Sequence, residues 1–165
     1  MMSFLVLCTG NSARSIMGEA LLRERGAGRV TAQSAGSKPV GAPNPFALAQ
    51  LRSAGHDIAD FRSKSWSEFE DGNGPDIDVV VTVCDSAAAE PCPYWPGAPV
   101  TAHWGLPDPA AATGTDTDIA RAFADAYAIL DHRVGLLMAY PFETLSKPDL
   151  RSLLGKIGTA LPTDT

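Results

Sequence analysis

The residues best suited to chemistry lie near the start of the chain, in the segment Cys8-Thr9-Gly10-Asn11-Ser12-Ala13-Arg14-Ser15. Arg14 follows Cys8 by six positions, and the residues between them are small or turn-forming. Successive backbone N–H groups of such a loop can converge on an anion, and the positive end of a following helix adds to the attraction. We therefore predict an oxyanion-binding loop made of Thr9, Gly10, Asn11, Ser12, Ala13, Arg14 and Ser15.

Individual side chains of this loop have roles set by their chemistry. A guanidinium group can hold two oxygens of a tetrahedral anion, so Arg14 is predicted to grip the bound oxyanion. Positive surroundings favour a charged sulfur, so we expect Cys8 to be a thiolate near neutral pH and to act as a nucleophile. Ser15 can donate a hydrogen bond to that sulfur, and Asn11 tolerates a left-handed backbone that the loop would need.

Two further cysteines, Cys84 and Cys92, stand eight positions apart. Cys84 directly follows the clearest strand pattern of the chain, residues 78–83. Ligands of open α/β sheets bind at the carboxyl ends of the strands, so Cys8 and Cys84 are expected at the same edge of the molecule. An odd number of cysteines without an export signal favours reduced, working thiols in the cytoplasm over a structural disulfide framework.

Alternating strand and helix patterns must position these residues. Strands and helices that follow one another in this way are typical of a parallel α/β sheet. The expected strands are 5–7, 30–34, 78–83 and 100–103, and the expected helices are 14–25, 45–54, 65–69, 117–139 and 148–160.

Size and composition limit the classes of function. The chain has 165 residues, of which 45% are hydrophobic and 19% charged, as in one globular domain of ordinary size. We expect a single domain over 1–165, with a core of about 3–141 and a C-terminal helix over about 147–160. The net charge of −6 argues against nucleic acid as a partner. No apolar run reaches the roughly 18 residues that cross a bilayer, and the widely spaced histidines predict no metal site.

The segment 4–15 resembles the low-molecular-weight protein tyrosine phosphatase family and, within it, the arsenate reductases that share that fold. The resemblance extends to about Asp108 and includes His103-Trp104-Gly105. It implies a three-layer α/β domain with a four-stranded parallel sheet flanked by helices. It also implies that Asp108, which stands between two prolines, is the general acid that protonates the leaving oxygen.

The same resemblance implies a relay of thiols. Cys8 would attack arsenate and form a covalent arseno-adduct. Cys84 would then attack Cys8, which releases arsenite and leaves a disulfide, and Cys92 would attack Cys84 and carry the disulfide to the surface. No bound cofactor is expected. The resemblance implies an external reductant, either thioredoxin or a glutathione–glutaredoxin couple, and phosphate or sulfate as analogues of arsenate.

Two other functions are compatible with the loop. One is a low-molecular-weight protein tyrosine phosphatase that hydrolyses phosphoesters through a phosphocysteine, and the other is a non-catalytic oxyanion-binding module. Phosphotyrosine enzymes tend to carry aromatic residues where this chain has Ala110-Ala111, and usually a second cysteine where it has Ala13. Both differences favour a small inorganic oxyanion. The retention of a nucleophile, an arginine and an acid together speaks against the binding module.

The chain departs from the reductases it resembles in three places. Cys84 and Cys92 stand one residue further apart than in the best-studied members. Lys64 stands where some relatives place an acid that helps to bind a monovalent cation, so we expect its ammonium group to take the place of that cation. The helix expected after Pro141 is additional to the shortest members.

Overall fold

The computed structural model of the 165-residue chain describes residues 1–70, 74–84 and 98–162. Within them the sheet has four parallel strands in the order β2-β1-β3-β4. The strands are β1 (Met2–Leu7), β2 (Val30–Ala35), β3 (Val79–Thr82) and β4 (Val100–His103). The helices are α1 (Arg14–Arg25), α2 (Pro45–Ser53), α4 (Asp116–Met138) and α5 (Lys147–Ile157), with short 3-10 helices η1 (Trp66–Phe69), η2 (Pro109–Ala111) and η3 (Phe142–Thr144). The predicted four-stranded parallel sheet is confirmed.

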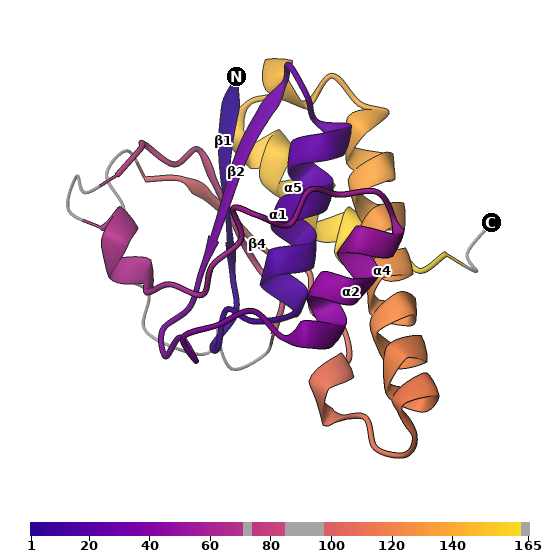
Figure 1. The fold of residues 1–165 in the computed structure, drawn as a ribbon. Coiled ribbons are helices and arrows are strands. Elements are labelled where there is room, and N and C mark those ends of the chain that lie inside the picture. The colour runs from indigo at the N-terminus through magenta and orange to yellow at the C-terminus, as the bar shows by residue number, and fades with distance from the viewer. Residues whose placement is uncertain (71–73, 85–97, 163–165) are drawn as a thin grey trace.

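The four α-helices lie together on one face of the sheet, as Figure 1 shows with the sheet seen from its edge. Alternate strand residues such as Phe4, Val6 and Val81 pack with these helices in the main core. On the opposite face, Leu5 and Val80 pack with the η1 region in a smaller cluster. Strands covered on both faces are apolar without alternation, which is why they form near-continuous runs of hydrophobic residues in the sequence.

Side-chain caps set where most helices begin. Asn44 accepts a hydrogen bond from Phe46 N and Pro45 occupies the first turn of α2, as the sequence predicts. Thr115 and Asp118 form a capping box, so α4 begins one residue earlier than expected. At the other end of the chain α5 stops at Ile157, three residues before the predicted limit.

Helix α5 belongs to the same core as the rest of the chain. The Trp104 indole Nε1 donates to the carbonyl oxygen of Leu154 at 2.9 Å, and both residues are buried. Arg133 of α4 donates to the carbonyl oxygens of Trp104 and Gly105 at 2.8 and 3.2 Å. These bonds hold in place the segment that leads from β4 towards Asp108.

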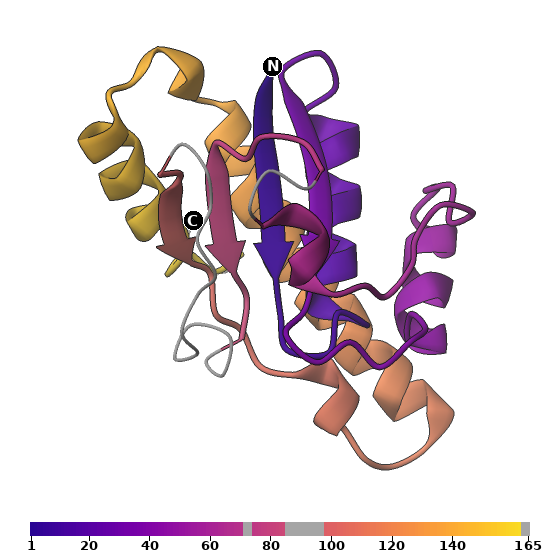
Figure 2. The same ribbon diagram turned by 90° about the vertical axis from the view of Figure 1, so that its left-hand side faces the viewer.

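The carboxyl ends of the strands meet at one edge, which is the lower edge in Figure 2. Leu7 pairs with Thr82, and the N–H of Val83 donates to the carbonyl oxygen of Leu7 at 3.0 Å. Cys8 and Cys84 therefore leave neighbouring strands side by side, as expected. Among the described residues, no helix has the length and apolar character needed to cross a membrane.

Candidate active site

The loop after β1 turns its carbonyl groups away from its centre. The carbonyl oxygens of Thr9, Gly10 and Ser12 accept hydrogen bonds from the backbone N–H groups of the neighbouring segment 38–44, at 3.0, 3.1 and 2.8 Å. By contrast, the N–H groups of residues 10–13 donate to no residue in the described part of the chain. Donors held in this way by outward bonds of their own loop form an anion cradle.

Helix α1 begins where this loop ends, and none of the residues that the structure describes caps its N-terminus with a side chain. No side chain accepts from its first N–H groups, and no acidic residue lies in its first turn. Such groups need an acceptor, and the helix dipole makes an anion the favoured one. The loop and the helix therefore offer their donors to the same place.

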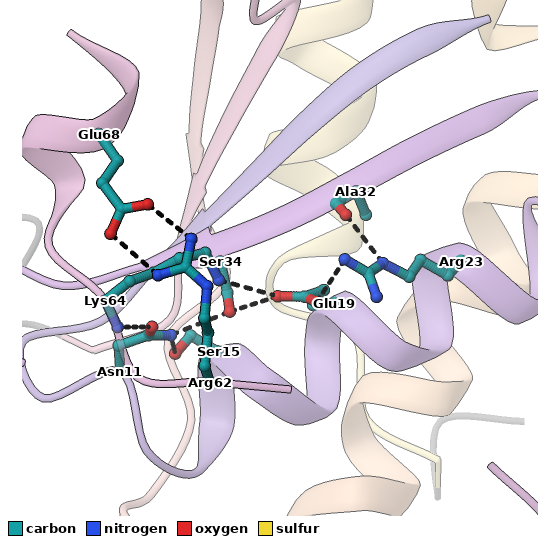
Figure 3. A network of polar contacts seen from close by, with 9 residues as sticks. All are labelled: Asn11, Ser15, Glu19, Arg23, Ala32, Ser34, Arg62, Lys64 and Glu68. Carbon is teal, nitrogen blue, oxygen red and sulfur yellow. Dashed lines mark hydrogen bonds and ion pairs between the residues drawn. The ribbon is translucent and has the colours of Figure 1, made fainter. Parts of the chain in front are cut away.

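The Asn11 side chain ties the loop to neighbouring segments. Its backbone is left-handed with φ 45°, as the sequence predicts. Its amide Nδ2 donates to the hydroxyls of Ser15 and Ser34, both at 2.9 Å, and its Oδ1 accepts from the Lys64 N–H at 2.9 Å. Figure 3 shows Asn11 at the centre of these contacts. The side chain is fully buried and joins three separate segments, so the left-handed turn is held from three directions.

A buried ion pair continues this network behind the loop (Figure 3). Glu19 of α1 accepts from the Ser34 hydroxyl at 2.5 Å and pairs with Arg23 at 2.7 Å. The Lys64 ammonium lies 3.8 Å from Glu19, and the two side chains are only 4% and 2% exposed. Burial lowers the pKa of Lys64, and Glu19 acts in the opposite direction. The Lys64 ammonium, expected in place of a bound cation, thus has a carboxylate partner in Glu19.

Gly36 is a requirement of the site that sequence reasoning missed. It follows β2, and a Cβ there would come within 2.3 Å of the Thr9 carbonyl oxygen and 2.7 Å of the Cys8 carbonyl oxygen. Only glycine allows the two backbones to approach so closely. The signal available in the sequence was a glycine directly after the strand that neighbours β1, but the pairing had to be known before it could be used.

Arg14 reaches across the carboxyl edge of the sheet. Its Nη1 donates to the carbonyl oxygen of Leu106 at 2.8 Å and approaches that of Val83 at 3.5 Å. Its Nη2 lies 3.7 Å from a carboxylate oxygen of Asp108. Two segments that are far from Arg14 in the sequence, one at Val83 and one at 106–108, therefore fix the direction of this guanidinium.

Asp108 is held at the N-terminus of η2. Its Oδ1 accepts from the N–H of Ala110 at 2.9 Å, and its Oδ2 is the atom near Arg14. The side chain is 45% exposed. A carboxyl group that borders both the loop and solvent can exchange protons with water and still reach a bound oxyanion, as a general acid must.

Cys8 and Cys84 line the same cavity, and the Thr9 hydroxyl lies 3.6 Å from the Cys84 sulfur. The Cys84 side chain and burial raise the pKa of Cys8, while Arg14 and the N–H of Thr9 act to lower it. The direction of this shift runs against the expectation that Cys8 is a thiolate near neutral pH. The reason is the second sulfur, because two adjacent thiols titrate as a pair and cannot both ionise easily.

The expectation for Ser15 is also corrected. Its hydroxyl accepts from Asn11, and among the described residues it makes no bond to Cys8. The remaining loop residues surround a cavity of about 270 Å³, together with Ala110. The predicted site residues that line this cavity are Cys8, Thr9, Gly10, Asn11, Ser12, Ala13, Arg14, Cys84 and Asp108. Cys92 lies outside the described residues.

Comparison with known proteins agrees with this geometry. Residues 3–149 match the family of low molecular weight phosphotyrosine protein phosphatases. The chain belongs to this family. Within it, the chain is 40% identical over 116 residues to an arsenate reductase of Bacillus licheniformis, which covers 68% of this chain and 77% of the relative. A glutaredoxin arsenate reductase of Synechocystis is 31% identical over 109 residues, covering 66% and 79%.

Solved structures of this family share the fold. A structure of an arsenate reductase in the phosphate-binding state superposes with a TM-score of 0.68 at 27% identity, over 84% of this chain and 98% of the other. Beside Asp108, the oxyanion cavity of this chain is lined by the methyl group of Ala110. It is therefore shaped for a small oxyanion and has no aromatic wall among the residues that line it.

Proposed function

We propose that this protein is an arsenate reductase that converts arsenate to arsenite through a relay of cysteine thiols. The observation that carries the proposal is the position of Cys84, which lines the oxyanion cavity together with Cys8. Hydrolysis of a phosphoester needs one nucleophilic sulfur. Reduction of an oxyanion needs a second sulfur, which forms a disulfide with the first and so releases two electrons. A related arsenate reductase at 40% identity supports the same conclusion.

The first step joins arsenate to Cys8. The loop N–H groups and Arg14 hold the oxyanion, and the Cys8 thiol loses its proton as its sulfur attacks arsenic. Asp108 gives a proton to the departing oxygen, which leaves as water. Because Cys84 and burial raise the pKa of Cys8, the thiol needs a base at the moment of attack. The arsenate dianion in the same cavity is a suitable acceptor.

The second step moves two electrons from sulfur to arsenic. The Cys84 thiol gives its proton to an oxygen of the departing arsenite as its sulfur attacks the Cys8 sulfur. The sulfur–arsenic bond breaks, and its electron pair stays with arsenic, which leaves as arsenite. A Cys8–Cys84 disulfide remains. Because the two cysteines leave neighbouring strands and line one cavity, this step needs little movement of the strands. Cys92 is proposed to attack Cys84 next and to carry the disulfide outwards.

An external thiol must then reduce the last disulfide. A relative at 31% identity is a glutaredoxin arsenate reductase, and a further structural neighbour, from Corynebacterium glutamicum, is a thioredoxin-dependent one. We propose a dithiol protein of the thioredoxin or glutaredoxin type as the partner of Cys92. Thiols that must be reduced after each turnover require a reducing compartment, so we propose that the protein acts in the cytoplasm.

The relay is tested by separating reduction from hydrolysis. Cys84→Ser and Cys92→Ser should each stop multiple-turnover arsenate reduction with a dithiol-protein recycling system, because the oxidised sulfur cannot leave the site. Both variants should keep any hydrolysis of a small aryl phosphate, whereas Cys8→Ser should lose both activities. Cys92→Ser should complete one turnover and trap a Cys8–Cys84 disulfide, measured by counting free thiols after one equivalent of arsenate. Multiple turnover in both variants would leave a phosphatase or an external-thiol reductase as the function.

A further inference from the structure

A second and larger cavity also has Arg14 in its lining. Its volume is about 600 Å³, and the residues that line it include Arg14, His103, Arg133 and Thr159. We call it the rear cavity. Arg14 lines the rear cavity and the oxyanion cavity alike, and within the described ranges it is the one residue that the two linings share.

Arg133 is the unusual residue of the rear cavity. The residue is only 2% exposed. Its Nε donates to the Ala160 carbonyl oxygen at 3.0 Å and its Nη1 to those of Trp104 and Gly105. Its Nη2 has no acceptor in the described ranges, and no carboxylate there forms an ion pair with it. Backbone carbonyls bring only partial charges, so a buried full positive charge has no counterion among the described residues.

The surroundings add to this positive charge. The described residues that line the rear cavity include two guanidinium groups and an imidazole, and none of them is an aspartate or glutamate. The Nη2 of Arg14 lies 3.7 Å from the nearer carboxylate oxygen of Asp108, which is too long for a hydrogen bond. Its Nη1 makes a shorter contact of 2.8 Å with the carbonyl oxygen of Leu106. This concentration of positive charge stands out on a chain with a net charge of −6. Buried charges in proteins are normally paired.

We propose that the rear cavity is a second oxyanion site, which takes a phosphate or sulfate group with Arg133 and Arg14 as its charged wall. The spare Nη2 of Arg133 supplies a donor, and planar guanidinium groups suit tetrahedral oxyanions. An anion bound here would share the charge of Arg14 with arsenate in the oxyanion cavity. Each anion would therefore weaken the binding of the other, and by linkage the effect is reciprocal.

Calorimetric titration with inorganic phosphate tests the site directly and does not depend on turnover. The wild-type chain should bind two phosphate ions. Thr159→Glu places a carboxylate in the rear cavity and should weaken the second phosphate by about tenfold or more. Thr159→Gln, which has nearly the same shape without the charge, should still bind two. Thr159 is exposed, so both variants are expected to fold.

The contribution of Arg133 is tested by the same titration, and the source of the oxyanion is tested by inhibition of arsenate reduction. Arg133→Gln should bind one phosphate, whereas Arg52→Gln, which removes an exposed arginine of α2, should bind two. As an inhibitor of arsenate reduction, phosphate should raise the KM for arsenate both by direct competition and through a second, saturable component in the wild type, and only by direct competition in Thr159→Glu. A phosphomonoester too large for the oxyanion cavity should give only the saturable rise in KM if the natural ligand is an organic phosphate. A single phosphate per wild-type chain, or a second site that survives in Thr159→Glu, would overturn the proposal.

Discussion

The two flanks of the oxyanion loop are built in opposite ways. On the Asn11 side, buried side chains join the loop to α1, β2 and Lys64 through hydrogen bonds of 2.5–2.9 Å and the Glu19 ion pair. On the Asp108 side, an acid that is 45% exposed stands 3.7 Å from Arg14. We call these the closed flank and the open flank.

The difference follows from what each flank must do. A cradle of backbone N–H groups stabilises an anion best when it is already in position, which requires the closed flank to be rigid. A general acid has to lose its proton and regain it in every turnover, which requires contact with water. Changes on the closed flank should therefore act mainly on stability, and changes on the open flank mainly on rate.

The largest effect on rate is expected from the open flank. Asp108→Asn keeps the size of the side chain but cannot supply a proton, so the first chemical step should slow by about 10²–10⁴-fold. The pH dependence due to an essential carboxylic acid should disappear, while the melting temperature changes little because the residue is partly exposed. Single-turnover formation of the arseno-adduct as a function of pH measures both. An unchanged rate and pH profile would remove Asp108 from the mechanism.

The largest effect on stability is expected from the closed flank. Glu19→Gln leaves the buried Lys64 ammonium without its counterion, which should lower the free energy of unfolding by about 3–5 kcal/mol. The matched control is Glu68→Gln, which breaks the exposed pair with Arg62 and should cost only about 0–1 kcal/mol. Urea denaturation measures both, and equal losses would contradict the comparison.

The loss of stability in Glu19→Gln should depend on pH. Burial lowers the pKa of Lys64 in the folded state, and Glu19 opposes that shift. Between the folded and unfolded pKa values the unfolded chain binds more protons, so stability rises with pH in that window. Without Glu19 the folded pKa falls further, so the window widens towards neutral pH. The loss of stability in Glu19→Gln should thus become smaller as the pH rises from 7 towards 10.5, the ordinary value for lysine.

A smaller effect is expected where the two sulfurs meet between the flanks. Cys84 is the largest cause of the raised pKa of Cys8, so Cys84→Ala should lower that pKa and raise the thiolate fraction at pH 8. Alkylation of Cys8 by iodoacetamide should then be faster. The comparison is made in a Cys92→Ser background to keep the count of thiols clear. Equal or slower alkylation would show that Cys84 does not hold the proton on Cys8.

The smallest effect is expected from monovalent cations. If the Lys64 ammonium already supplies the positive charge next to Glu19, exchanging sodium for potassium at constant ionic strength should change neither activity nor melting temperature. Both can be followed on the wild-type chain. A stabilisation specific to potassium would show that a cation site remains on the closed flank.

The sequence allowed the fold and much of the site to be predicted because both depend on local patterns. The apolar runs and helical spacing predicted the parallel sheet, and the limits of α1 and β4 were correct to the residue. Cys8, Arg14 and the loop between them are close in sequence, so their placement depends only on a strand, a turn and a helix. Cys84 could be assigned to the same edge because strand ends in a parallel sheet coincide. The role of Cys92 stays a prediction.

What the tertiary structure decided are the contacts between distant segments. The pKa of Cys8 is raised because Cys84, 76 positions away, lies against it, and no property of the loop alone contains that information. Likewise Glu19 and Lys64 look like surface residues in the sequence, yet folding buries them as a pair. The physical reason is the same in each case. Ionisation and desolvation depend on the distance between groups and on the water excluded around them, and the chain acquires both only when its segments pack together.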